Sequence, residues 1–475
     1  MLIVAGTLGC AEATPEQQVI NDAAAALGGR DRLLAARTLS AEDGSGRQFN
    51  LGQDMRPDAR GQTFTVSAMS RRVDLVNARA RTELTRTPNF AFFQGPQPQK
   101  QVQGIDGSLG YNVAGDGTAS RIADPAARDR RADYFHHPVT AVRAALAEGS
   151  RLSNVERSDS ERRVDVTLAD GLVFTLVTDP AGLPVRIESA SAHPNLGDVR
   201  LSTLFADYQE VSGLKLPASI TTKVDDFVTA ELRYGRQSVD GALELAAPPA
   251  AASAAAISGP PAPNVVVQDI APGVWLLAGQ SHHSALIELS DQLLLVEAPQ
   301  SEARTLAVLA KVRELRPDKP LRKIVTTHHH FDHTAGIRAA AAGGLTIVTH
   351  SGNRAFFEAM TSRRHSIVAD TLAKNPKTVT VETVDDELAI KDALRTVMLY
   401  HIAGNPHSDT MLMVYLPKER VIMEVDAYSP GSAANPYAAN LLENITKRKL
   451  AVDRIVPLHG TVAPFADLAK TQTGG

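Results

Sequence analysis

The chain of 475 residues is long enough for two or three domains, and its 49 Lys and Arg against 53 Asp and Glu give a formal net charge of −4 at pH 7. With 33 Gly and 27 Pro the composition is ordinary, which excludes collagen-like and low-complexity chains. The weak negative charge without a basic block argues against a nucleic-acid partner, and the single cysteine excludes a disulfide framework or a cysteine-based zinc ribbon.

Residues 1–13 resemble a signal or lipoprotein segment. A short apolar run ends in Ala11-Glu12-Ala13, which has the small-x-small form that signal peptidase cuts, and Thr7-Leu8-Gly9-Cys10 resembles a lipobox. We therefore expect an exported or periplasmic protein in which Cys10 is either removed or lipidated, with association to envelope lipid or a membrane anchor in the second case. A cytoplasmic protein with an irregular N-terminus is the alternative.

Residues 14–245 are predicted to form a β-rich accessory domain of the α+β type. Thr14 to Gln17 supply an N-cap, a proline at the first helical position and a capping-box glutamine, and Gly28-Gly29 ends the helix that they begin. From about residue 38 to residue 240 the pattern is mostly that of strands, which predicts an antiparallel sheet with a few helices. One of these helices is expected after Pro138.

A Pro, Ala and Ser tract at residues 246–263 has no periodic pattern and predicts a linker. In residues 264–475 strands and helices alternate, which indicates a layered α/β domain. The pattern predicts strands at Val265–Leu277, Ala285–Glu297, Arg322–Thr327 and Leu345–Thr349, and helices at Glu302–Arg313 and His333–Ala342. Because open α/β folds bind ligands at the carboxyl ends of strands, residues at those ends are the first candidates for a site.

The segment Thr326 to His333 contains the motif H-x-H-x-D-H where a predicted strand gives way to a helix. In extended backbone, residues two apart share a face, so His328 and His330 can bind one metal while His329 points away and is structural. Asp332 and His333 can then bind a second metal beside the first. Such a pattern arises by chance in a chain with 14 His only about once in a thousand, so the motif is a strong signal.

Three further candidates follow later strands, namely His407, Asp426 and His459. Together with the motif they make five His and two Asp, a set that suits zinc, with manganese or iron as alternatives, and that contains no thiolate. The sequence therefore predicts a dinuclear site. We assign His328, His330 and His407 to the first metal, Asp332, His333 and His459 to the second, and Asp426 as the bridge.

The motif and the later His, Asp and His resemble the metallo-β-lactamase-fold hydrolase superfamily, over about residues 264–470. The resemblance implies an αββα sandwich with two metals at one edge. Its glyoxalase-II-like and lactonase-like branches use an all-His/Asp ligand set, which carries over to the seven residues assigned above. The branch with a cysteine ligand is excluded because Cys10 is N-terminal, and the di-iron oxygen-reductase branch usually has Glu in place of His330. Many relatives have Asp where this chain has Glu297.

The β-rich region has a resemblance of its own. Segments such as Asp207 to Pro217 resemble the curved β-sheet domains of periplasmic lipoprotein carriers. A plain accessory or dimerisation domain is the alternative, and the oligomeric state stays open.

The site predicts a metal-dependent hydrolase with a hydroxide shared by two zinc ions, which cleaves an ester, lactone, thioester or amide bond in a small-molecule substrate. Asp332 is expected to hold the second metal and orient the hydroxide. Two alternatives remain: a metal-dependent oxidoreductase of the same fold, of the persulfide-oxidising type, and an envelope lipid- or ligand-binding protein with an accessory metal site. The residues expected to line the substrate pocket are His282, His283, Tyr428, Tyr437 and Asn440.

Overall fold

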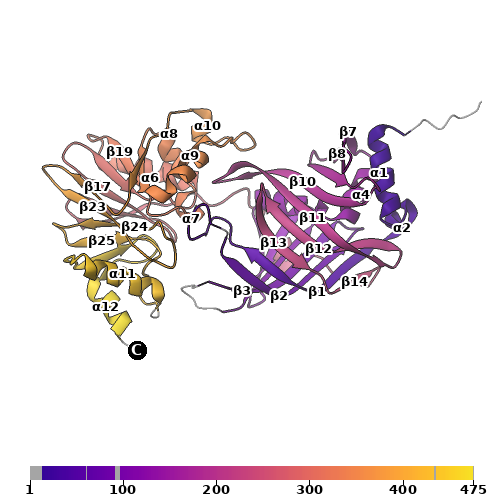
Figure 1. The fold of residues 1–475 in the computed structure, drawn as a ribbon, viewed down its shortest axis with the longest axis horizontal. Helices are drawn as coiled ribbons and strands as arrows, with labels where there is room; N and C mark the ends of the chain where they lie inside the picture. Colours follow the sequence, from indigo (N-terminus) through magenta and orange to yellow (C-terminus); the bar gives the residue numbers. More distant parts are fainter. Residues whose placement is uncertain (1–12, 60, 91–96, 433–434, 474–475) are drawn as a thin grey trace, which may run out of the picture.

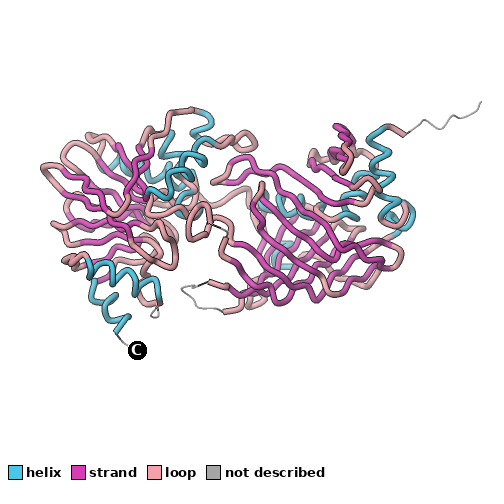
Figure 2. Tube along the Cα trace, viewed as in Figure 1, coloured by secondary structure: helices cyan, strands magenta, loops and turns pink. Residues whose placement is uncertain are grey.

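The computed structural model describes residues 13–59, 61–90, 97–432 and 435–473, and it shows two lobes side by side (Figure 1). Residues 1–12 of the predicted signal or lipoprotein segment, including Cys10, lie outside the described residues. One lobe is an antiparallel β-rich domain, and the other is a layered α/β sandwich (Figure 2). This order of a β-rich α+β domain before an αββα domain confirms the predicted fold class. No helix among the described residues is both long and apolar enough to cross a membrane.

The β-rich lobe is one sheet of 14 strands in the order β6-β5-β4-β3-β2-β1-β13-β12-β11-β10-β9-β8-β7, with β14 also pairing with β1. Its strands are β1 (Thr38–Phe49), β2 (Thr63–Asp74), β3 (Arg79–Pro88), β4 (Gln99–Asp106), β5 (Leu109–Val113), β6 (Ala119–Arg121), β7 (Arg151–Arg157), β8 (Arg162–Thr167), β9 (Val173–Thr178), β10 (Pro184–His193), β11 (Gly197–Val211), β12 (Leu214–Val224), β13 (Phe227–Arg233) and β14 (Arg236–Val239). Its helices are α1 (Pro15–Ala26), α2 (Arg30–Ala35), α3 (Asp124–Phe135) and α4 (Pro138–Leu146).

Helices α1 and α4 begin where the sequence predicts. The Thr14 side chain accepts a hydrogen bond from Gln17 N, and the Gln17 side chain accepts one from Thr14 N at 2.9 Å, which completes the predicted capping box. Both helices bury an apolar face against the sheet, and Val19, Ile20 and Val139 are each at most 1% exposed. The helices therefore cover one face of the sheet and give the lobe its core.

The tract at 246–263, predicted as a linker, follows the surface of the β-rich lobe and contains a short helix, α5 (Pro249–Ser253). Ala251 in this helix is completely buried. The backbone of Asp124 donates to Ile257 O at 2.7 Å, and Ala247 N donates to the Asp106 carboxylate at 2.9 Å. Its small side chains allow this close packing, and Pro249 favours a helix start, so the connection has a defined course.

The second lobe stacks two sheets. The first holds seven strands, β15 (Val266–Ala271), β16 (Val274–Ala278), β17 (Ser284–Glu288), β18 (Leu293–Val296), β19 (Leu321–Val325), β20 (Thr346–His350) and β21 (Val381–Val384). The second holds six strands, β22 (Glu387–Lys391), β23 (Thr396–His401), β24 (Leu412–Leu416), β25 (Val421–Glu424), β26 (Arg454–Pro457) and β27 (Ala463–Pro464). The helices are α6 (Glu302–Leu315), α7 (Phe331–Thr334), α8 (Ile337–Ala342), the short η1 (Ser351–Asn353), α9 (Arg354–Ser362), α10 (Thr371–Lys374), α11 (Pro436–Lys447) and α12 (Phe465–Thr473).

Three apolar layers hold this lobe together. One fills the space between the two sheets, one lies between the first sheet and helices α6, α8 and α9, and one lies between the second sheet and helices α11 and α12. In Figure 1 these helices lie on the two outer faces of the sandwich. The arrangement is the αββα sandwich that the resemblance implied.

Three predicted elements differ in detail. Val265–Leu277 and Ala285–Glu297 are each two strands rather than one, because the chain turns at Gly273, where φ is +75°, and again between β17 and β18. The helix predicted at His333–Ala342 is divided into α7 and α8 by Gly336. A Cβ atom at Gly336 would lie 1.9 Å from Thr305 Oγ1, so this glycine permits close contact with α6.

The lobes touch at α7 and just after α9. Asn195 Nδ2 of the β-rich lobe donates to Thr334 Oγ1 in α7 at 3.0 Å, and Arg363, which follows α9, contacts Asp225 Oδ2 through Nη2 at 2.5 Å. The loop between β1 and β2 meets Phe331, whose N donates to Gly52 O at 3.1 Å. The histidine-rich segment of the sandwich therefore lies at the boundary between the lobes (Figure 1).

Candidate metal centre

The H-x-H-x-D-H segment follows β19 at the edge of the sandwich and leads into α7. His328, His330 and His333 are each at most 1% exposed. His329 turns away from the other histidines, and its Nδ1 lies 3.4 Å from Thr410 Oγ1. The extended backbone thus separates the two faces as the sequence predicts.

Two clusters of metal-binding side chains meet at this edge. The first comprises His328, His330, His407 and Asp426, whose ligand atoms lie within 4.8 Å of one another. The second comprises His282, Asp332 and His333.

Asp426 connects the clusters. Its Oδ2 atom lies 3.1 Å from His407 Nε2 and 3.6 Å from His328 Nε2 in the first cluster, and 2.9 Å from His333 Nε2 in the second. One carboxylate oxygen therefore faces histidines of both clusters, which is the position of a bridging ligand.

The unpaired ring nitrogens show that the centre suits metal ions. Within the two clusters, four buried ring nitrogens make no hydrogen bond to the described residues: His328 Nε2, His330 Nδ1, His333 Nε2 and His407 Nε2. Leaving such groups unpaired in the interior is costly. In three of these rings the other nitrogen has a protein partner: Thr327 Oγ1 for His328, the backbone oxygen of Asp54 for His330, and Glu297 Oε2 for His333. Such partners orient histidines that ligate metals, so the residues fit two divalent cations.

Comparison with known proteins agrees with this geometry. Residues 278–423 match the family model described as the metallo-beta-lactamase superfamily. Residues 278–423 are a metallo-beta-lactamase superfamily domain. The match leaves the β-rich region without a family assignment, so its likeness to lipoprotein carriers stays a prediction.

Several solved metallo-beta-lactamases are similar to this domain. The enzyme FIM-1 from Pseudomonas aeruginosa, solved in a mono-zinc form, is 19% identical, with a TM-score of 0.33 over 44% of this chain and 93% of its own. Metallo-beta-lactamases from Pontibacter korlensis and Hirschia baltica are 18% and 16% identical, with TM-scores of 0.33 and 0.34. Each match covers 44% of this chain, and they cover 98% and 95% of those two proteins.

Beside the two clusters, two buried glutamates support the candidate ligands. Glu297 follows β18 with φ at +68°, and its Oε1 accepts a hydrogen bond from Thr327 N at 2.6 Å while Oε2 lies 3.2 Å from His333 Nδ1. Glu424 ends β25, and its Oε2 accepts hydrogen bonds from two backbone N–H groups in the turn beyond Asp426. The glutamate that departs from the pattern of many relatives therefore fixes both the backbone of the motif and the ring of His333.

Electrostatics at the centre favour bound cations. Burial lowers the pKa of His328 well below the usual histidine range, and repulsion from His330 lowers it further, so this ring is neutral at pH 7. Burial would raise the pKa of Asp426, but the charge of His333 outweighs it and holds that pKa well below its usual value. Burial would likewise lower the pKa of His333, yet Asp426 and Asp332 raise it well above the usual range. The carboxylates thus favour positive charge here, which a divalent cation supplies as well as a proton does.

The second cluster differs from the predicted ligand set at one position. His282, expected in the substrate pocket, lies with Asp332 and His333, and its Nε2 is 3.2 Å from Asp332 Oδ2. His459 is not grouped with them, although its ring centroid lies 4.0 Å from that of His282 and it lines the cavity beside the clusters. The assignment of His459 to the second metal stays a prediction, and the structure adds His282 as a competing ligand.

A cavity of about 290 Å³ opens beside the two clusters. The sandwich contributes the candidate ligands Asp332, His407, Asp426 and His459 together with Ser429 and Tyr437. The β-rich lobe contributes Asn50, Gln53, Gln62 and Phe90. The site is therefore built from both lobes.

Of the residues predicted to line the substrate pocket, only Tyr437 lies in the lining of this cavity. His283 is engaged in the fold, because its Nδ1 accepts from Gly279 N and its Nε2 is 3.1 Å from Gly460 O. Tyr428 is 3% exposed, and the Asn440 side chain donates to Ala403 O at 3.0 Å.

The four lining residues from the β-rich lobe were not predicted. Sequence reasoning misses them because they lie in segments that follow strands of a sheet remote in the chain from the motif: Gln53 and Asp332 are 279 positions apart. No local pattern around Asn50 or Phe90 distinguishes them from other residues at strand ends.

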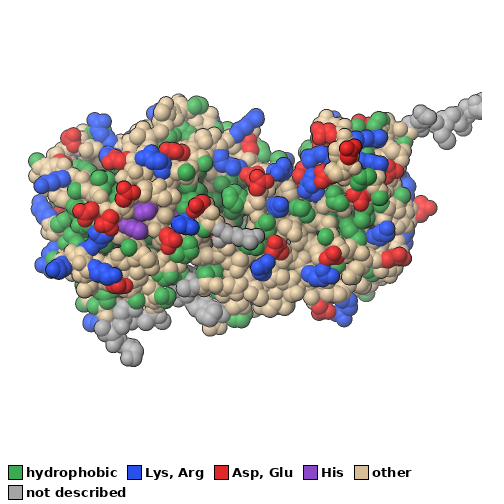
Figure 3. Space-filling view, viewed as in Figure 1, with side chains coloured by type: hydrophobic (Ala, Val, Ile, Leu, Met, Phe, Trp, Pro, Cys, Tyr) green, Lys and Arg blue, Asp and Glu red, His purple; other side chains and the backbone are tan. Residues whose placement is uncertain are grey.

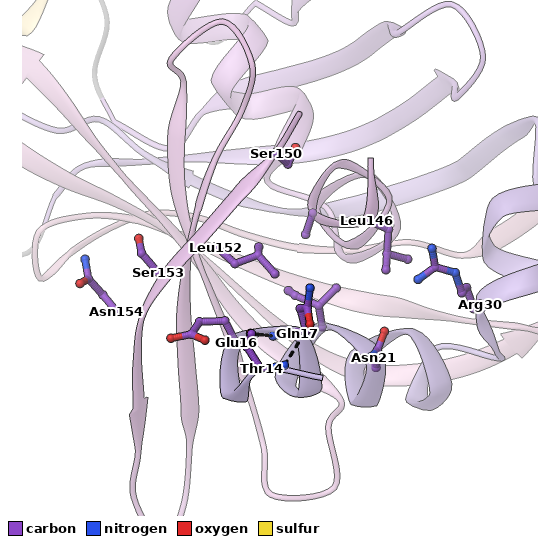
Figure 4. A pocket seen from close by; sticks show the side chains of 12 residues that line it. Thr14, Glu16, Gln17, Asn21, Arg30, Leu146, Ser150, Leu152, Ser153 and Asn154 are labelled. Carbon is purple, nitrogen blue, oxygen red and sulfur yellow. Dashed lines mark hydrogen bonds between the residues drawn. The ribbon is translucent and has the colours of Figure 1, made fainter. Parts of the chain in front are cut away.

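A larger cavity of about 650 Å³ lies elsewhere in the β-rich lobe, between α1, α4 and β7 (Figure 4). Its labelled side chains include Glu16, Asn21 and Arg30, with Leu146 and Leu152 among the apolar ones. None of the metal-binding clusters found in the described residues lies there. The reactive groups therefore belong to the smaller cavity.

Proposed function

We propose that this protein is a dinuclear zinc-dependent hydrolase that cleaves an ester, lactone, thioester or amide bond in a small molecule. The position of Asp426 between the clusters carries the proposal, because a shared carboxylate is what holds two cations close together. The match of the domain to the metallo-beta-lactamase superfamily supports it.

His328, His330 and His407 would hold one zinc ion, and Asp332 and His333 the other, completed by His459 or His282. Two divalent cations supply Lewis-acid chemistry, which polarises a carbonyl oxygen and lowers the pKa of bound water toward about 7. No side-chain nucleophile is then required.

The protein's own residues prepare this chemistry. The Glu297 carboxylate holds the His333 ring in place, while the Asp54 carbonyl fixes the hydrogen of His330 on Nε2 and leaves Nδ1 for the metal. Burial opposes ionisation of Asp332, but the charge of His333 and a hydrogen bond from His282 hold its pKa below the usual range. Asp332 is therefore a carboxylate at neutral pH. It can bind a cation or accept a hydrogen bond.

Metal analysis combined with turnover tests the proposal. We expect about two zinc ions per chain and chelator-sensitive hydrolysis of at least one member of a panel containing an aryl ester, a lactone, a thioester and a β-lactam. Asp426→Asn should lose zinc and activity together. His350→Asn is the matched control, because this histidine lies outside both clusters and caps η1 through a bond that Asn can replace. One iron per chain without turnover would contradict the proposal and favour the oxidoreductase.

A further inference from the structure

We propose that the β-rich lobe supplies part of the active site. The loop between β1 and β2, residues 50–59 with 61 and 62, forms a wall of the pocket, positions Asp332 through Gln53 and selects an uncharged substrate. This inference rests on the proposed hydrolase function, and it identifies the class of substrate.

The backbone of the β1–β2 loop is anchored to the segments that carry the candidate ligands. The carbonyl oxygens of Gly52, Asp54 and Met55 accept hydrogen bonds from Phe331 N at 3.1 Å, from His330 Nε2 at 2.9 Å and from Asp409 N at 2.8 Å. Of these donors, His330 is a candidate metal ligand, and Phe331 and Asp409 lie within two residues of one. The loop therefore cannot move without disturbing the metal centre.

Glycine at position 52 permits this close approach. Its φ is +77°, and a Cβ atom there would lie 2.2 Å from the ring of Phe331. The loop thus presses directly on the first turn of α7, where Asp332 and His333 lie.

Gln53 connects the loop to the second cluster. Its Nε2 donates a hydrogen bond to Asp332 Oδ1 at 2.6 Å, while Asp332 Oδ2 faces His282 Nε2 at 3.2 Å. The two contacts fix the rotation of the carboxylate, so Gln53 acts as a positioning residue for a metal ligand. Gln53 also lines the cavity, where it can contact a bound substrate.

The lining of the cavity indicates the substrate class. Away from the clusters it presents neutral hydrogen-bonding groups from Asn50, Gln53, Gln62 and Ser429, and rings from Phe90 and Tyr437. Among the described residues that line it, none is Lys or Arg. A phosphate or carboxylate group on the substrate would lack a cationic side chain here, whereas a neutral group with hydrogen-bonding and apolar parts is complementary.

Zinc affinity tests the positioning role without relying on turnover. Competition with a chromophoric chelator should show that Gln53→Ala and Gln53→Glu each weaken binding of one zinc ion by about 10- to 100-fold. Gln53→Glu keeps the size of the side chain, but its carboxylate cannot donate a hydrogen bond to Asp332 and repels it. If Gln53 only filled space, the zinc affinity of this variant would stay close to that of the wild type. Asp58→Ala is the control, because Asp58 is an exposed residue of the same loop whose ion pair is with Arg56 at 3.7 Å.

A pair of esters tests the selection of substrate charge. 4-Nitrophenyl butyrate and mono-4-nitrophenyl succinate have similar size, but only the second carries a carboxylate. The wild type should prefer the neutral ester in kcat/KM. Asn50→Lys should move this preference toward the anionic ester by about tenfold, and Asn50→Asp should move it the other way.

The outcomes separate the two proposals. Unchanged zinc affinity in both Gln53 variants, or an unchanged ester preference in both Asn50 variants of an active enzyme, would overturn the role of the loop while the hydrolase stands. A wild type that binds zinc but cleaves no ester, lactone, thioester or amide would overturn the hydrolase, and the zinc titration would still decide whether Gln53 positions Asp332.

Discussion

At the scale of single residues, the metal centre depends on groups that do not themselves face the metal positions. Glu297 makes two contacts: one carboxylate oxygen accepts a hydrogen bond from the backbone of Thr327, and the other lies against the ring of His333. A carboxyl group that is completely buried is tolerated only with such partners. Its carboxylate therefore serves the metal centre through His333.

Glu297→Gln should weaken zinc binding by about 10- to 100-fold, because an amide that still accepts from Thr327 N turns its NH₂ group toward the His333 ring. Glu297→Asp keeps a carboxylate and should retain more of the affinity. A zinc-competition titration measures both, with the exposed Glu314→Gln as control. Equal affinity in Glu297→Gln and wild type would show that the glutamate has no part in orienting the ring.

The ligand motif was predictable because its residues are neighbours in the sequence, and a strand alternates its side chains whatever surrounds it. The sequence predicts His282 for the substrate pocket instead, since its distance from Asp332 depends on how two separate loops pack. Glu297 was recognised only as a departure from relatives, because its contact with His333 requires two adjacent parallel strands, β18 and β19, to end together.

At the scale of elements, the β1–β2 loop is held where two requirements coincide. Gly52 adopts a positive φ that favours glycine, and it also lies against the ring of Phe331. Gly107, in the turn between β4 and β5, has a similar φ of +61° but no atom within 4 Å of an added Cβ. A substitution at Gly107 therefore measures the cost of backbone strain alone, and one at Gly52 measures that cost together with the clash against Phe331.

Gly107→Ala should lower the free energy of unfolding by about 1 kcal/mol, the cost of strain alone. Gly52→Ala should lower it by roughly a further 1–3 kcal/mol, because Phe331 must move. Thermal or urea denaturation of both variants measures the difference. Equal losses in the two variants would mean that the loop yields without disturbing α7.

Helix α4 carries a pH-sensitive cap. His137 Nδ1 accepts from Val139 N at 3.3 Å, and burial, with a smaller contribution from the charge of Arg71, lowers the pKa of His137 to about 3. A histidine whose pKa is lower in the folded state contributes stability above its unfolded pKa of about 6.5, and this stability is lost as pH falls below that value toward 3.

His137→Asn keeps a capping acceptor but removes the titration. The wild type should lose roughly 1–2 kcal/mol more stability than this variant between pH 7 and pH 5. Urea denaturation of both proteins at the two pH values measures the difference. Parallel losses would mean that His137 takes up its proton without unfolding the cap.

At the scale of the whole molecule, the metal centre and the contact between lobes belong to one structure, because the β1–β2 loop binds the residues next to the ligands. The face drawn in Figure 3 mixes acidic and basic side chains over both lobes. The lobes are joined by specific contacts, such as those of Gly52 and Asp54 and the ion pair of Arg363 with Asp225.

Removal of zinc should destabilise both sides of this boundary. Zinc at about 1,000 times its dissociation constant stabilises the folded state by about 4 kcal/mol, so chelation should lower the midpoint of thermal unfolding by roughly 10 °C. Hydrogen exchange should rise in residues 50–59 as well as around α7, and stay unchanged in β7 and β8 at the far edge of the large sheet. A rise in hydrogen exchange that is confined to the sandwich would contradict the coupling between zinc binding and the contact of the two lobes.

The lobes themselves could be predicted because each has its own residue pattern, strands in the first and alternating strands and helices in the second. Their contact could not. The Pro, Ala and Ser tract suggested a linker, and its packing on the β-rich lobe through Ala251 rests on small side chains that carry no periodic signal. The pocket is formed by residues from both lobes, and neither pattern contains that information.

Gln53 is 279 positions before Asp332, so the two residues are synthesised at different times. At about 5–20 residues per second, the ribosome completes the β1–β2 loop roughly 15 to 55 seconds before the residues that it will hold. Through that interval the carbonyl groups of Gly52, Asp54 and Met55 are solvated by water, and Asp426 is synthesised later still. Nascent chains therefore pass most of their synthesis without a complete set of candidate metal ligands, and the contacts of the loop with these segments can form only after both lobes are made.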